Sequence, residues 1–170
     1  MKKLLAYFLD LCLLRSAPQD LPASGILFSL TLPANLGVTL LLVGGAEVDR
    51  GAALWQSLLD TALMLAILYL VLRLRNWTGR FLQTATALLG SSALLGILTI
   101  PAVYLSSVAA EGITTAVAAW LLLLLIGWSM LVGGHILRHA LEVRLGQGVL
   151  IAVLFQLAAY ALVNLLIPVR

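Results

Sequence analysis

Five long apolar runs constrain the fold of this chain more than any other feature of its sequence. Each is close to the ~20 residues that a helix needs to cross a hydrocarbon core, and together they cover residues 26–43, 52–72, 84–105, 113–132 and 148–167. A backbone in hydrocarbon can satisfy its polar groups only in a helix or a closed barrel, and the strands of a barrel would alternate in polarity. These runs do not alternate, so the sequence predicts an all-α, polytopic membrane bundle of five transmembrane helices.

The composition agrees with a membrane protein. Hydrophobic residues make up 62% of the chain and charged residues only 10%, against roughly 45–50% and 25% in soluble domains. The net charge of +3 does not indicate nucleic acid as a partner, because the basic residues are spread thinly between the apolar runs. The single cysteine, Cys12, excludes an intramolecular disulfide framework and a cysteine-based zinc site. We expect no nucleic-acid partner and no cofactor.

The first 24 residues have a different pattern. A pair of lysines followed by an apolar run is similar to a secretory signal peptide, but Asp10 interrupts the run and no small-residue cleavage site follows it. The run is too short to span a membrane and fits an amphipathic helix in the cytoplasmic interface. The residues that we expect to face lipid or the bundle are Leu4, Leu5, Phe8, Leu11 and Cys12. Pro18 and Pro22 then break the helix, so we divide the chain into a cytoplasmic helix with its linker, residues 1–24, and a five-helix transmembrane domain, residues 25–170.

Lysine and arginine are distributed unevenly between the two sides of the predicted bundle. Alternate connecting segments hold eight of these residues against two, and the two on the poorer side are Arg50 and Arg170. Cytoplasmic loops carry the excess of basic residues in membrane proteins. We therefore expect a multi-pass protein of the inner (plasma) membrane of the cell, with its N-terminus in the cytoplasm and its C-terminus in the exterior or periplasm.

Two stretches of the sequence are similar to a known family of small membrane proteins. RFLQTATALLGSSALLGILTIP, residues 80–101, places a polar turn before a helix rich in small residues, and WLLLLLIGWSMLVGGHILRHALEVRLGQGVLIAVL, residues 120–154, joins two apolar helices through a short cytoplasmic hairpin. With the five-run topology, these stretches resemble the Yip (Ypt-interacting protein) family and its bacterial relatives. The Asp-Leu-Tyr-Gly-Pro element of the eukaryotic members is absent here. The resemblance therefore implies a compact five-span protein, and it carries neither small-GTPase binding nor a catalytic residue over to this chain.

One carboxylate interrupts the second apolar run. At 1.5 Å per residue, Asp60 lies about 12 Å from the outer end of that run, so it should face the bundle interior instead of lipid. Gln56 lies one turn earlier on the same face. Polar residues also repeat every four positions in two other runs, and we expect these stripes to meet Asp60 near the midplane. They are Thr31, Asn35 and Thr39 in the first run, and Gln156, Tyr160 and Asn164 in the fifth.

Two interpretations of this intramembrane polar cluster stay open. In the first, Asp60 holds helices together by hydrogen bonds to Asn35 or Asn164. In the second, Asp60 is the titrating group of a proton or cation site, or of a path for a polar substrate. The absence of a second intramembrane carboxylate or of a basic partner in the apolar runs favours the first interpretation.

A second candidate cluster lies between the fourth and fifth runs, in residues 133–148. If this segment is helical, four side chains share an arc of about 100°: His135, Arg138, His139 and Glu142. Two imidazoles and a carboxylate suit zinc, but Arg138 would repel a cation and is spaced to pair with Glu142, so we expect no metal. The alternatives are a solvated interfacial face and a contact with a partner or with anionic lipid. Arg73, Arg75 and Arg80, predicted on the same side, favour contacts with lipid headgroups.

The sequence has no motif that carries a catalytic mechanism, such as a P-loop, a nucleophile elbow or His-Glu-x-x-His. We therefore expect a protein that is not an enzyme and that acts through other membrane proteins or through lipid, as a scaffold or an organiser of the membrane. The alternative is a small transporter or channel component with a proton or cation site at Asp60. A homo-oligomer is compatible with both functions.

Overall fold

The structure is a computed structural model that describes residues 2–43, 50–108 and 112–166, and every regular element in these ranges is helical. Five long helices form the bundle: α2 (Gly25–Val43), α3 (Arg50–Leu74), α4 (Phe81–Val108), α5 (Ile113–Leu141) and α6 (Leu145–Leu166). Each contains a stretch that is long and apolar enough to cross a membrane. The all-α bundle predicted from the sequence is confirmed. The expected position of the C-terminus falls on residues outside the described ranges.

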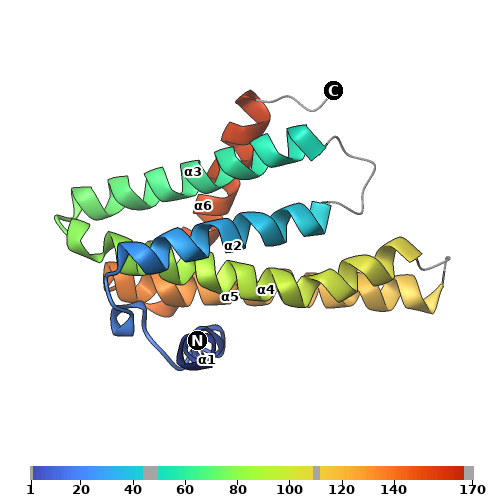
Figure 1. Cartoon of the computed structure of the whole chain (residues 1–170), viewed down its shortest axis with the longest axis horizontal. Coiled ribbons are helices and arrows are strands. Elements are labelled where there is room, and N and C mark those ends of the chain that lie inside the picture. Colours follow the sequence, from blue (N-terminus) through green and yellow to red (C-terminus); the bar gives the residue numbers. More distant parts are fainter. Residues whose placement is uncertain (1, 44–49, 109–111, 167–170) are drawn as a thin grey trace.

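Helix α4 is the centre of the bundle. Of its spanning stretch, 39% is buried, against 17% or less in the other four helices. It packs against α2 on one side and α5 on another, while α6 begins beside α5 and then crosses α3 (Figure 1). A side chain on Gly96 of α4 would overlap Val38 of α2, so the absence of one lets these two helices approach closely.

Helix α1 (Lys2–Cys12) lies across the flank of α4 and α5, and Figure 1 shows it nearly end-on while α2, α3, α4 and α5 run along the view. Its Phe8, Leu11 and Cys12 are buried against the bundle. The ring of Phe8 occupies the space that a side chain at Gly90 of α4 would need. Of the residues predicted to face lipid or the bundle, Phe8, Leu11 and Cys12 contact the bundle and Leu4 packs against the same cluster, whereas Leu5 is 55% exposed.

One end of the bundle collects the linker 13–24, the connection 75–80 and the turn 142–144 (Figure 1). We call it the basic end because of the arginines that lie there: Arg73, Arg75, Arg80, Arg138 and Arg144. Helices α1, α3 and α5 are each followed, within two residues, by a non-glycine residue in the left-handed region. The φ angles are 62° at Leu14, 59° at Asn76 and 53° at Glu142. After each, an amide donates to the carbonyl five residues before it at 2.8–3.0 Å, which closes the helix end.

The fourth spanning helix is longer than predicted. The sequence pattern ends it at residue 132 and places a cytoplasmic hairpin at 133–148, but α5 continues to Leu141 and only residues 142–144 separate it from α6. The physical reason is a close approach of the two helices. A Cβ on Gly134 would overlap Val149, and a Cβ on Gly148 would overlap the backbone of Gly134. This contact buries a segment that looks like a polar loop in the sequence.

Candidate functional site

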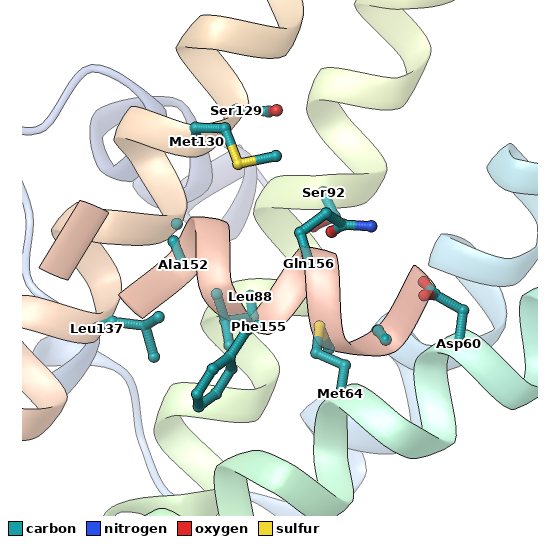
Figure 2. Close-up of a pocket in the computed structure, with 12 residues that line it drawn as sticks. Asp60, Met64, Leu88, Ser92, Ser129, Met130, Leu137, Ala152, Phe155 and Gln156 are labelled. Carbon is teal, nitrogen blue, oxygen red and sulfur yellow. The ribbon is translucent and has the colours of Figure 1, made fainter. Parts of the chain in front are cut away.

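Asp60 faces a cavity of about 120 Å³ between four helices (Figure 2). Figure 2 shows its carboxylate directed from α3 toward α6, with Met64 one turn further along α3. The residues that line the cavity come from α3, α4, α5 and α6: Asp60, Met64, Leu88, Ser92, Ser129, Met130, Gly133, Leu137, Ala152, Phe155, Gln156 and Ala159. Asp60 is half-buried and faces the helices that line this partly open cavity.

Four of the lining side chains are polar. Asp60 and Gln156 belong to the predicted cluster, whereas Ser92 of α4 and Ser129 of α5 do not. The Ser129 hydroxyl donates to the Ile126 carbonyl at 2.7 Å. Among the described residues, no hydrogen bond or ion pair joins the Asp60 carboxylate to another side chain. The cavity is large enough for water, which could bridge the carboxylate to these polar groups.

The polar stripe of the first spanning helix is in a different place. Asn35 and Thr39 of α2 do not line this cavity. The Thr39 hydroxyl donates to the Asn35 carbonyl at 3.0 Å, and that of Thr31 donates to the Phe28 carbonyl at 3.1 Å, so both are satisfied within their own helix. Gln56, half-buried on α3, also does not line the cavity. The side chain of Asn164 lies outside the described residues.

His135 is not part of a solvated face, as one interpretation of the sequence had it. It is 2% exposed, and its Nε2 lies 2.8 Å from the Ser16 carbonyl of the linker. Because a carbonyl only accepts, Nε2 carries the proton in this contact. The ring also packs edge-on against His139, with 4.8 Å between the ring centroids. Within the described ranges, no group of three or more His, Cys, Asp or Glu is placed to hold a metal ion.

Glu142 pairs with Arg80, and the pairing with Arg138 expected from spacing is wrong. The Arg80 guanidinium lies 2.6 Å from Glu142 Oε1 and also donates to the Ala140 carbonyl at 3.4 Å. Helical i, i+4 geometry does not apply to Glu142 because it lies past the helix end, in the left-handed conformation. Arg80 also stands over the Trp77 ring at 4.7 Å, and Arg75 at 5.6 Å. Arg73 is exposed at the end of α3.

The N-terminal segment is tied to the bundle by side chains that the sequence pattern did not single out. Trp128 of α5 donates to the Cys12 carbonyl at 3.1 Å. Gln83 of α4 donates to the Leu21 carbonyl at 2.7 Å, and Gln19 donates to the His139 carbonyl at 2.9 Å. Each bond joins a polar side chain to a linker or helix-end carbonyl far away in sequence, a relation that no local motif encodes. The segment 2–24 and the basic end therefore form one packed unit.

Two titratable groups of this segment are shifted by the packing. Burial raises the pKa of Tyr7 to about 12, with the charge of Asp20 as the second cause. The Tyr7 hydroxyl therefore stays protonated and donates to the Ala17 carbonyl at 2.5 Å. Burial raises the pKa of the Cys12 thiol to about 11, so this cysteine is protonated and unreactive while α1 is docked.

Fold and site together define an all-α membrane protein with five helices able to span the bilayer and a flanking N-terminal helix. No family model, no curated protein and no solved structure matches the chain.

Proposed function

We propose that this protein is a non-catalytic integral membrane protein of the Yip-like type that acts through contacts with other membrane proteins and with lipid. The docked helix α1 is the observation that supports this most. Its inner face is buried on α4 and α5, yet its outer face is also apolar, with Leu5 55% and Leu9 43% exposed and Leu13, in the turn that follows the helix, 49% exposed. Spaced four apart, these leucines form one stripe. The bundle thus presents a fixed apolar surface at its flank.

The surroundings of α1 suit a position in the membrane interface. The helix lies across the spanning helices on the side of the basic end, and an amphipathic helix in this orientation buries its apolar residues at the boundary of headgroups and acyl chains. The positive-inside rule supports a cytoplasmic location for the basic end, and we propose the inner (plasma) membrane as the membrane that the helices span. A stripe held there meets both lipid and the spanning helices of neighbouring proteins.

Site-specific photo-cross-linking in native membranes tests this function. A photoreactive residue replaces Leu9, and the matched control replaces Leu124, which is 68% exposed on α5. We expect a discrete protein adduct from position 9 and lipid adducts from position 124. Slow alkylation of Cys12 in both variants confirms that α1 stays docked. Lipid adducts alone from both positions would contradict a protein partner at α1.

A small transporter or channel component is the second candidate, and the cavity at Asp60 favours it. The carboxylate faces a space lined by the polar groups of Ser92, Ser129 and Gln156, and no described side chain bonds it directly. A carboxylate beside an internal cavity can exchange a proton or bind a cation.

Flux measurements in proteoliposomes decide between the two functions. Asp60→Asn removes the titratable proton with little change in size, and Asp10→Asn removes one carboxylate outside the spanning helices as the matched control. A non-catalytic interaction protein shows no proton or monovalent-cation flux that depends on Asp60. A flux that is present in the wild type and in Asp10→Asn but lost in a folded Asp60→Asn protein would establish the transporter.

A further inference from the structure

A pocket of about 330 Å³ lies at the basic end, apart from the cavity at Asp60. It is formed where α5 stops, α6 begins and the linker passes, and its lining residues are Gln19, Arg138, His139, Glu142, Val143, Arg144 and Leu145. The volume is in the range of small-molecule pockets in proteins. Its lining thus combines two guanidinium groups, one imidazole, one carboxylate, a side-chain amide and two apolar residues.

The charges of this pocket do not cancel. Its only carboxylate in the described lining, Glu142, is already paired with Arg80 at 2.6 Å, and Arg80 does not line the pocket. With Arg80 and Glu142 as a neutral pair, Arg138 and Arg144 are opposed only by Asp20, whose charge acts on His139 of the lining, so one positive charge is left over. The first turn of α6 begins at Leu145 on the rim, and the free amides of a helix start add a partial positive charge. The pocket attracts an anion.

Arg138 carries the clearest sign of a missing partner. Its Nε is buried, and among the described residues no hydrogen-bond acceptor reaches it. A buried donor of a charged group without a partner is costly, and most such donors in proteins are bonded. This atom is closed to a ligand from outside, so the unpaired charge of Arg138 attracts an oxyanion through the part of the side chain that lines the pocket. Guanidinium groups recognise phosphate oxygens especially well because they offer planar, paired donors.

We propose that this pocket binds the phosphate group of an anionic phospholipid. The location favours lipid over a soluble ligand, because the pocket opens where two spanning helices meet the predicted cytoplasmic interface. Val143 and Leu145 give it an apolar wall. The start of the acyl chains can lie against this wall while the headgroup occupies the pocket. The inference deepens the proposed function by naming one lipid class, and it rests on that function.

Native mass spectrometry of the purified protein in neutral detergent tests the site. The probes are short-chain phosphatidylglycerol, phosphatidylcholine with the same acyl chains, and inorganic phosphate. The variants are Arg138→Gln and Arg144→Gln, and the matched control is Arg73→Gln, which removes one exposed charge at the same end but outside the pocket. Slow alkylation of Cys12 confirms that each variant is folded. If Arg138→Gln does not fold, the test of the site rests on Arg144→Gln.

We expect one phosphatidylglycerol bound saturably, weakened about tenfold or more in either pocket variant because a charged hydrogen bond is lost. The Arg73→Gln control should bind as the wild type does. Equal weakening in all three variants, or equal binding of phosphatidylcholine, would overturn the site. Inorganic phosphate bound as tightly as the lipid would overturn the choice of lipid. If the wild-type protein binds no phosphatidylglycerol but position 9 still gives a protein adduct, only the lipid site is rejected. If the lipid binds but position 9 gives no protein adduct, only the protein partner at α1 is rejected.

Discussion

A methyl group at Gly90 should release α1 from the bundle. The Cβ of alanine at this position would overlap the ring of Phe8, whose edge atoms occupy that space. Overpacking of this kind typically costs about 1–3 kcal/mol. The higher helix propensity of alanine does not offset the cost, because α4 is helical whether α1 is docked or not. The cost therefore falls on the docking equilibrium, and the undocked fraction should rise about 5- to 150-fold.

Cys12 provides the assay, because it is the single cysteine of the chain and lies in the last turn of α1. It is 5% exposed, and burial raises the pKa of its thiol from 9.0 to about 11. The reactive thiolate is then about 100-fold scarcer at neutral pH than in an exposed cysteine. Maleimide labelling in detergent should accelerate in Gly90→Ala by the same factor as the undocked fraction. In the docked state, the labelling rate should keep rising as the pH is raised to about 11, because the thiolate fraction grows up to the pKa of Cys12.

Two further variants make the test specific. Gly127→Ala in α5 adds the same methyl group in open space and should label at the wild-type rate. Phe8→Leu removes the ring atoms that an alanine at position 90 would overlap, so Gly90→Ala should have a smaller effect in this background. Labelling of Gly90→Ala at the rate of Gly127→Ala would refute the docking of Phe8 on Gly90.

The end of α5 and the orientation of the bundle give two more predictions. Glu142 is in the left-handed region and its bridge to Arg80 is solvent-exposed, so Glu142→Ala should lose the weak bridge and keep the strain, whereas Glu142→Gly relieves the strain. Unfolding in mixed micelles should show the glycine variant about 1 kcal/mol more stable than the alanine variant, and the reverse order would contradict this account. A reporter active only outside the cytoplasm should be on when fused after Arg170 and off when fused after Arg75, and reversed signals would overturn the predicted orientation.

The number and class of the helices could be predicted because membrane hydrocarbon leaves the backbone few alternatives. Apolar length alone identifies a spanning helix, and all five predicted runs are helical in the described residues. The end of α5 could not be predicted in the same way. His135, Arg138 and His139 look like a loop in a hydropathy pattern, but the contact between Gly134 and Gly148 buries their helix against α6. Such a contact depends on two positions that are separate in sequence.

The partners of the basic end were also beyond local patterns. Spacing on one helix suggested that Glu142 meets Arg138, yet the left-handed turn moves Glu142 to Arg80, which is 62 residues away. The linker could be identified from Pro18 and Pro22, but its bonds to Gln83 and His135 connect segments that only the tertiary fold brings together. A pattern on one helix predicts a neighbour only when the helix continues through both residues.

The polar stripes of the spanning helices show which residue types report on their surroundings. A threonine hydroxyl can donate to a carbonyl of its own helix, as Thr31 and Thr39 do, so a threonine stripe needs no partner and does not indicate which face is inside. A carboxylate only accepts hydrogen bonds when it is ionised, and the amides of an interior helical turn are already engaged. An ionised Asp60 therefore cannot be satisfied within α3 and requires space or donors from other helices. For this reason the acid locates the cavity between α3, α4, α5 and α6, whereas the threonine stripe of α2 does not.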